Sequence, residues 1–164
     1  MNDFVFQNTT KIYFGKNQLG HLGEELKSFG STVMLVYGGS SIKRIGLYDK
    51  IIAELQKAGM KILEYAGIEP NPRHTSINEG AKICRENNVD VLLAIGGGSV
   101  IDSAKAMSVT RYYDGDCWDL VTQSVSVDQG LPLIAVPTMA SAGSENDAWA
   151  VISNADTNQK LDPW

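Results

Sequence analysis

The sequence predicts an α/β fold in which helices pack on both faces of a parallel sheet. Apolar runs of strand length alternate along the chain with segments of helical periodicity, in a β-α-β-α-β-α order. Residues 89–105 show the pattern most clearly, with a nearly continuous apolar run, then Gly96-Gly97-Gly98, then apolar residues at helical spacing. Such a run is typical of a strand that is covered on both faces, as in a parallel sheet. Parallel strands joined in this way have right-handed crossovers.

Composition places the chain among ordinary globular proteins and predicts one domain over residues 1–164. The 164 residues can bury a core, and 43% of them are hydrophobic and 20% charged. A net charge of −5 without a basic run argues against a nucleic-acid partner. The apolar runs are too short to span a membrane, and the N-terminus lacks the pattern of a signal peptide. Cys84 and Cys117 form no C-x-x-C pair, so we expect free thiols in a reducing cytoplasm.

Two short strands are expected at the start of the chain, at residues 4–6 and 11–14. Asn17 can cap a helix whose apolar residues recur every three or four positions, and Gly30 can end it. A buried strand follows at residues 33–37, because this run is apolar and rich in residues that favour strands.

A second helix, closed by Gly59, leads into a more amphipathic strand at residues 61–65. Ser76 and Glu79 form a capping box, which predicts a third helix with Cys84 on its packed face. This helix precedes the apolar run before the triple glycine.

The last third of the chain is expected to hold two more strands and a long polar connection. The elements predicted there are a helical turn at residues 116–120, a buried strand at 131–136, a loop at 139–147, a strand at 148–152 and a frayed end from residue 156.

The triple glycine predicts an anion site. Backbone N–H groups of the turn and the positive end of the following helix converge on one point, and a Cβ there would block the anion. The alternative is purely structural, because Ser99 followed by Asp102 also fits ordinary helix capping. The pattern matches neither G-x-G-x-x-G nor a Walker motif, so the turn alone indicates an anion and no more.

Three expected strands end in small, glycine- or hydroxyl-rich loops, at residues 38–41, 96–99 and 138–144. The carboxyl ends of parallel strands lie along one edge of a sheet, where ligands bind. Three such loops fit an extended polyanion, such as a dinucleotide, better than a single phosphate.

Several motifs in this chain resemble the N-terminal half of the iron-containing, metal-dependent alcohol dehydrogenases, and most closely the bacterial NAD(P)H-dependent butanol dehydrogenase branch. The motifs that carry the resemblance lie at residues 13–15, 36–43, 67–73, 94–105 and 143–152. Their order runs through nearly the whole chain. The resemblance implies a Rossmann-like parallel sheet, similar to the N-terminal domain of dehydroquinate synthase, and a nicotinamide cofactor across the three loops.

The resemblance also implies where the cofactor lies. Gly97, Gly98 and Ser99 would hold the pyrophosphate, with Asp102 behind them. The residues expected to face the adenosine ribose are Gly38, Gly39 and Ser40.

Four further positions match the family's cofactor-binding residues. Asn71 and Thr138 correspond to positions near the adenosine part, and Asp147 and Lys160 to positions near the nicotinamide ribose. Alternatives remain: Asn71 between two prolines is a good turn residue, and Thr138 after Pro137 could merely cap a loop.

NADP is favoured over NAD as the cofactor. Family members that prefer NAD tend to carry an acidic residue near the first loop, and this chain has none before Asp49. It has Ser40, Ser41 and Lys43 instead, and hydroxyls with an ammonium group would accept a 2′-phosphate that a carboxylate would repel. Lys43 could equally be a solvated surface lysine.

The family's metal, iron or zinc, is held by one aspartate and three histidines in a helical C-terminal domain. This chain has only His21 and His74, both expected at the surface, so we expect no metal ligands and no catalytic residues in it. The helical domain is expected to be absent, and the simplest explanation is a fragment, either an engineered domain or a truncated reading frame.

The function expected from the resemblance is that of an oxidoreductase. The chain would be the cofactor-binding portion of an enzyme that interconverts short-chain alcohols, such as butanol, and aldehydes by metal-assisted hydride transfer. An alternative is a nucleotide-binding module without activity, and a more distant one is a relative of dehydroquinate synthase or glycerol-1-phosphate dehydrogenase. We expect self-association, with a homodimer through residues 4–14 as one possibility.

Overall fold

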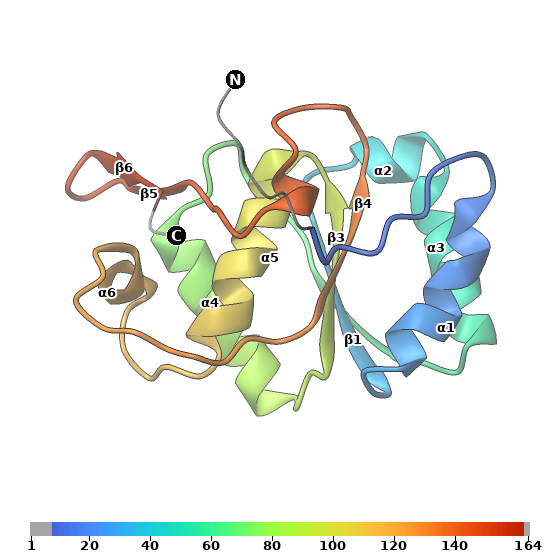
Figure 1. The fold of residues 1–164 in the computed structure, drawn as a ribbon, viewed down its shortest axis with the longest axis horizontal. Coiled ribbons are helices and arrows are strands. Elements are labelled where there is room, and N and C mark those ends of the chain that lie inside the picture. The colour runs from blue at the N-terminus through green and yellow to red at the C-terminus, as the bar shows by residue number, and fades with distance from the viewer. Residues whose placement is uncertain (1–7, 163–164) are drawn as a thin grey trace, which may run out of the picture.

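The computed structural model of the chain describes residues 8–162. Its centre is a sheet of four parallel strands in the order β2-β1-β3-β4 (Figure 1). The strands are β1 (Thr32–Tyr37), β2 (Lys61–Tyr65), β3 (Val91–Gly96) and β4 (Leu133–Pro137). The α/β fold with a parallel sheet that the sequence predicts is therefore confirmed.

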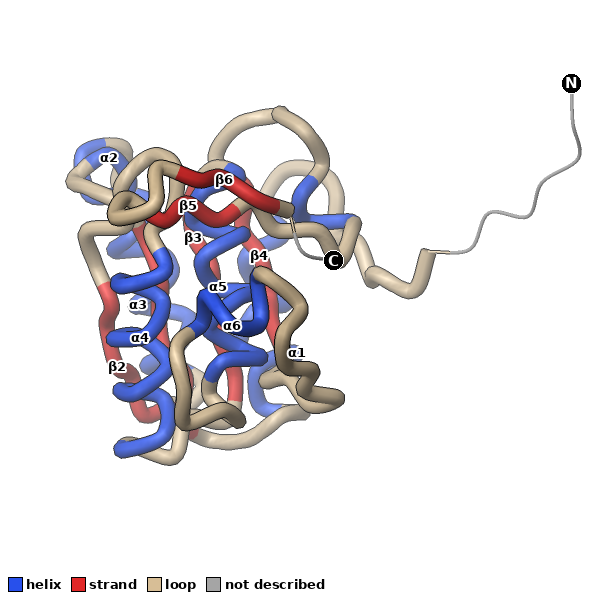
Figure 2. Tube along the Cα trace, turned by 90° about the vertical axis from the view of Figure 1, so that its left-hand side faces the viewer, coloured by secondary structure: helices blue, strands red, loops and turns tan. Residues whose placement is uncertain are grey.

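Helices cover both faces of this sheet, as Figures 1 and 2 show. The helices are α1 (Leu22–Lys27) and α3 (Leu47–Lys57) on one face, and α4 (His74–Glu86) and α5 (Gly98–Thr110) on the other. Successive side chains of a strand point to opposite faces. In β1, Met34 packs in the core with α4 and α5, and Leu35 packs in the core with α1 and α3. The sheet thus separates two hydrophobic cores.

The inner strands β1 and β3 are buried along their whole length, as their apolar runs predict. β4 lies at the edge of the sheet and is only half-buried from Leu133 to Val136, so the prediction of a buried strand there is only partly correct. An edge strand has a neighbour on one side only, and the apolar run of β4 could not reveal its place in the sheet.

Shorter elements complete the described chain. They are η1 (Gln18–His21), α2 (Ser41–Arg44), α6 (Cys117–Val121), η2 (Ser144–Asn146), β5 (Ile152–Asn154) and β6 (Gln159–Leu161). β5 and β6 form an antiparallel hairpin, and the Ser153 N–H donates to the Pro72 carbonyl oxygen at 2.7 Å. No helix of the described residues is long and apolar enough to cross a membrane.

The N-terminal predictions are partly wrong. Residues 11–14 form no strand, and Ile12 and Phe14 are 62% and 95% exposed. The other expected strand, residues 4–6, lies outside the described residues, and the dimer through residues 4–14 stays a prediction. Asn17 does not cap a helix through its side chain, because its backbone is left-handed with φ 61°, and a 3-10 turn precedes the short α1.

Three further predictions, on the start of α4, the strand at residues 148–152 and the frayed end, differ from the structure for identifiable reasons. α4 begins at His74 without a side-chain cap, and Glu79 of the expected capping box accepts a hydrogen bond from the Tyr65 hydroxyl instead. The strand expected at residues 148–152 begins only at Ile152, because the backbone before it is bound to side chains of α5. The expected frayed end forms β6, which its hairpin with β5 stabilises.

The Asp90 carboxylate connects the start of β3 to the start of β1 and packs against Gly30. Asp90 Oδ2 accepts the N–H groups of Ser31 and Thr32 at 2.8 and 2.9 Å. Gly30 has φ +155°, and a Cβ there would lie 2.3 Å from Asp90 Cγ. Only glycine leaves room for this carboxylate.

We predict that G30A destabilises the fold by about 2 kcal/mol more than G59A. Gly59 also has a positive φ, +69°, but a Cβ there would meet nothing within 4 Å, so G59A is a control for backbone strain alone. Urea unfolding, monitored by circular dichroism, measures the free energy of unfolding of both variants. Equal losses of stability in G30A and G59A would show that the added Cβ at residue 30 is accommodated beside Asp90 without a cost in stability.

Candidate cofactor-binding site

Three loops leave neighbouring parallel strands at one edge of the sheet. In the register of the strands, Tyr37 lies opposite Ile95, and Gly96 lies opposite Pro137. β1, β3 and β4 therefore end at the same level, and the predicted gathering of the three loops at one edge is confirmed.

Close contacts connect the loops with one another and with α5. The Thr138 N–H donates to the Gly96 carbonyl oxygen at 3.0 Å. A Cβ on Gly97 would lie 3.4 Å from Met139 Sδ, and a Cβ on Gly38 would lie 3.9 Å from Val100 Cγ2. The turn after β3 is thus flanked by the other two loops.

α5 begins directly after this turn. Gly97 is the N-cap, and its carbonyl oxygen accepts the N–H groups of Val100 and Ile101 at 3.0 and 3.2 Å. The first amides of a helix have no partner within it, so those of Gly98 and Ser99 can serve a ligand. A Cβ on Gly98 would meet nothing within 4 Å, so this residue borders open space. This geometry suits an anion such as a diphosphate.

Ser99 and Asp102 do not cap α5 as the sequence suggested. Ser99 is the second residue of the helix, and its hydroxyl oxygen accepts the Asn71 N–H at 3.4 Å. Asn71 has a left-handed backbone, φ 59°, and its side-chain oxygen accepts a 2.7 Å hydrogen bond from Lys160 Nζ. The structure therefore brings Ser99, Asn71 and Lys160 together, although Lys160 lies in the segment expected to fray.

Asp102 binds the loop that follows β4. The Ser144 hydroxyl donates to Asp102 Oδ1 at 2.5 Å, and the Val151 N–H donates to Oδ2 at 3.1 Å. One turn further along α5, Lys105 Nζ lies 2.7 Å from Asp147 Oδ1. Sequence reasoning missed Lys105 and Ser144; the signal for Lys105 was a charge three residues after Asp102, on a helix with no other charged residue.

A polar cluster lies beside the loop after β1. The hydroxyls of Tyr37 and Tyr48 each donate to one oxygen of Glu64, both at 2.6 Å, and hold the pKa of Glu64 below its usual value. Burial, and then the bond to Glu64, raises the pKa of Tyr37 to about 12. Lys43 Nζ lies over the Tyr48 and Tyr37 rings, 4.6 and 5.5 Å from their centroids. The ammonium group is thus kept near the expected ribose loop, whose Gly39 and Ser40 are exposed.

The two histidines lie far apart in the fold and differ in exposure. His21 is exposed, as predicted, and stacks on Tyr13 with the ring centroids 4.4 Å apart. His74 was expected at the surface but is 6% exposed, because it starts α4 and packs beside Trp118. Residues 8–162 contain no group of three or more His, Cys, Asp or Glu side chains that could hold a metal ion. The expectation that this chain holds no metal ligands stays a prediction.

Both cysteines are free, as the sequence predicts, and both are buried, which was predicted for Cys84 alone. Burial raises the pKa of each thiol to about 12, so both stay protonated at neutral pH. The cytoplasmic location that the free thiols suggested stays a prediction.

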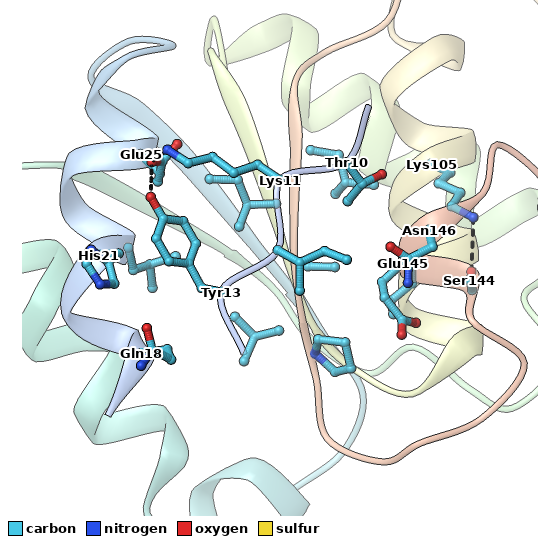
Figure 3. Close-up of a pocket in the computed structure, with 18 of the residues that line it drawn as sticks. Thr10, Lys11, Tyr13, Gln18, His21, Glu25, Lys105, Ser144, Glu145 and Asn146 are labelled. Carbon is cyan, nitrogen blue, oxygen red and sulfur yellow. Dashed lines mark hydrogen bonds and ion pairs between the residues drawn. The ribbon is translucent and has the colours of Figure 1, made fainter. Parts of the chain in front are cut away.

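A broad groove of about 2070 Å³ borders the site without including the turn after β3. It runs between residues 9–22 and the segment from β4 to residue 148, and Thr138 and Asp147 line it. Figure 3 shows Lys105 and Ser144 on one wall, with Tyr13 hydrogen-bonded to Glu25 on the other. The predicted site residues thus divide between an open edge at α5 and the neighbouring groove.

The family model described as iron-containing alcohol dehydrogenase matches residues 9–163. The chain belongs to this family, which agrees with the resemblance found in the sequence motifs.

Individual relatives give finer matches. The chain is 52% identical over 161 residues to NADH-dependent butanol dehydrogenase B of Clostridium acetobutylicum, covering 98% of this chain and 41% of that protein. It is 37% identical over 163 residues to an NADPH-dependent aldehyde reductase of Escherichia coli, with the same coverage of 98% and 41%. The crystal structure of NADH-dependent butanol dehydrogenase A from Thermotoga maritima superposes with a TM-score of 0.94 at 39% identity, covering 99% of this chain and 41% of that one. The chain therefore spans about two-fifths of the length of these relatives.

Proposed function

We propose that this chain is the cofactor-binding portion of an NAD(P)-dependent alcohol dehydrogenase that interconverts short-chain, butanol-like alcohols and aldehydes by metal-assisted hydride transfer. The observation that carries the proposal is the open N-terminus of α5 at the point where β1, β3 and β4 end together. The names of the relatives support the reaction class, since these proteins are NADH-dependent butanol dehydrogenases and an NADPH-dependent aldehyde reductase.

In this proposal the chain binds and orients the cofactor. The amides of Gly98 and Ser99, with Gly97 leaving the backbone accessible, take the diphosphate at the positive end of α5. Ser99 also accepts the Asn71 amide, and Lys160 binds Asn71, so the β5–β6 hairpin brings a positive charge to the edge of the turn. The positive charge and the helix end both favour a dianionic group.

The two ends of the dinucleotide would lie on either side of this turn. Gly38, Gly39 and Ser40 would take the adenosine ribose, with Asn71 and Thr138 near the adenosine part; the Thr138 N–H donates to the Gly96 carbonyl oxygen. Asp147 and Lys160 would lie near the nicotinamide ribose, and Asp102 holds the loop that carries Asp147 through Ser144 and Val151. A bound nicotinamide supplies the two-electron hydride chemistry.

A second function is a nucleotide-binding module without catalysis. The absence of a metal-binding cluster among residues 8–162 favours it for this polypeptide, because the family's chemistry depends on a metal. The two proposals share the cofactor site and differ in turnover.

We predict that G98A lowers NADH and NADPH affinity by about tenfold or more, because its methyl group occupies the space where the diphosphate would lie. The fold should tolerate the change, since a Cβ at Gly98 meets nothing within 4 Å. Cofactor fluorescence titration measures binding, and thermal unfolding checks stability. G20A, at a glycine with equally open surroundings in η1, is the control. Unchanged affinity in G98A would contradict the proposed diphosphate site.

Within this proposal the chain prefers NADP, because the hydroxyls of Ser40 and Ser41 and the ammonium group of Lys43 accept its 2′-phosphate. We predict that K43M lowers NADPH affinity about tenfold and changes NADH affinity less than about twofold, since only NADPH carries the 2′-phosphate. The same titration measures both cofactors, with K57M on α3 as a control for loss of one exposed lysine. Equal effects on the two cofactors would show that Lys43 does not contact the 2′-phosphate.

The two functions are separated by an assay of butanal reduction with NADPH or NADH and added Fe²⁺ or Zn²⁺. We expect cofactor binding without turnover from this chain, because residues 8–162 bring no metal ligands together. Turnover that is lost on chelation would support the complete enzyme over the binding module. Failure of the wild-type chain to bind either cofactor would contradict both proposals.

A further inference from the structure

Lys105 lies one turn after Asp102 on α5 and is the centre of a hydrogen-bond network with the loop after β4. Its Nζ donates to Asp147 Oδ1 at 2.7 Å, to the Trp149 carbonyl oxygen at 2.7 Å and to Ser144 Oγ at 3.1 Å. An ammonium group has three hydrogens, so these three acceptors use all of them. The Lys105 side chain is only 12% exposed, although it carries a charge.

The network gives the Asp147 carboxylate a defined orientation. Asp147 Oδ1 accepts from Lys105 and from the Trp149 N–H, the latter at 3.0 Å. Within the described part of the chain no donor binds the other oxygen, Oδ2. Ser144 extends the network, because its hydroxyl accepts from Lys105 and donates to Asp102. The position of Asp147 therefore depends on α5, the helix whose first turn forms the proposed diphosphate site.

From this geometry we propose that Lys105 is a positioning residue for the nicotinamide half of the cofactor. It binds Asp147 through Oδ1, leaves Oδ2 available to the hydroxyls of a ribose, and holds the loop at a set distance from the turn after β3. This inference rests on the proposed function, because it takes the ligand of Asp147 to be the nicotinamide ribose. Lys105 itself does not touch the cofactor in this proposal.

The test compares NADH with ADP, which shares the adenosine and diphosphate groups but lacks the nicotinamide ribose. We expect K105M to lower NADH affinity about tenfold and to change ADP affinity less than about twofold, measured by isothermal titration calorimetry. K105R, which keeps the positive charge opposite Asp147, should recover most of the NADH affinity. K82M removes an exposed lysine on α4 and serves as the control.

A double-mutant cycle identifies the route of the effect. If Lys105 acts through Asp147, K105M should change NADH affinity less than about twofold in the D147N background. Two outcomes would overturn the inference and assign Lys105 a purely structural role. One is that the losses of NADH affinity in K105M and D147N are additive. The other is that K105M and K105R both lose ADP and NADH affinity equally. Failure of the wild-type chain to bind ADP and NADH would instead contradict the proposed function, so the two failures are distinguishable.

Discussion

The structure depends on burying β3 between two helical layers and continuing it directly into α5. Six consecutive residues of β3 are buried, with alternate side chains in the two cores. A single extended residue, Gly97, separates the strand from the helix. Because the strand is held by β1 and β4 on either side, the first turn of α5 has little freedom to move. An anion site made of backbone amides needs this rigidity, since its donors cannot adjust as side chains do.

α5 connects the parts of the site because it contributes at several points along its length. Its first turn presents free amides, its second turn binds the loop after β4 through Asp102 and Lys105, and its buried face packs on α4 and the sheet. Arg85 of α4 donates to the carbonyl oxygens of Thr110, Arg111 and Tyr113 at the other end. A cation at that end of a helix also interacts favourably with the helix dipole. Both ends of α5 are thus fixed, which in turn fixes the loop that carries Asp147.

The proposed cofactor role draws on the groups that this arrangement brings to the carboxyl edge of the sheet. The described residues gather glycines, hydroxyls and the lysines Lys43, Lys105 and Lys160 around one sheet edge, and Asp102 and Asp147 lie in the network of Lys105. In the proposed function, these groups bind and orient a dinucleotide.

Much of this could be predicted from local pattern. Continuous apolar runs predicted β1 and β3, and the glycine turn after β3 predicted an open helix N-terminus, because both depend on neighbours within a few residues in the chain. The meeting of the three loops at one edge was implied by the parallel topology, whereas the order of the strands was not. Residues matched through the family resemblance, such as Asn71 and Lys160, are brought to the same edge.

What the tertiary structure alone decided concerns contacts between segments distant in sequence. Asp102 looked like a helix cap but binds Ser144 and Val151, more than 40 positions away. His74 looked exposed but is buried beside Trp118, and the expected frayed end forms a hairpin that carries Lys160 to Asn71. Local sequence specifies backbone conformation through propensity and spacing. Which polar side chain meets which loop depends on how helices pack on the sheet, and that is settled only when the chain is folded.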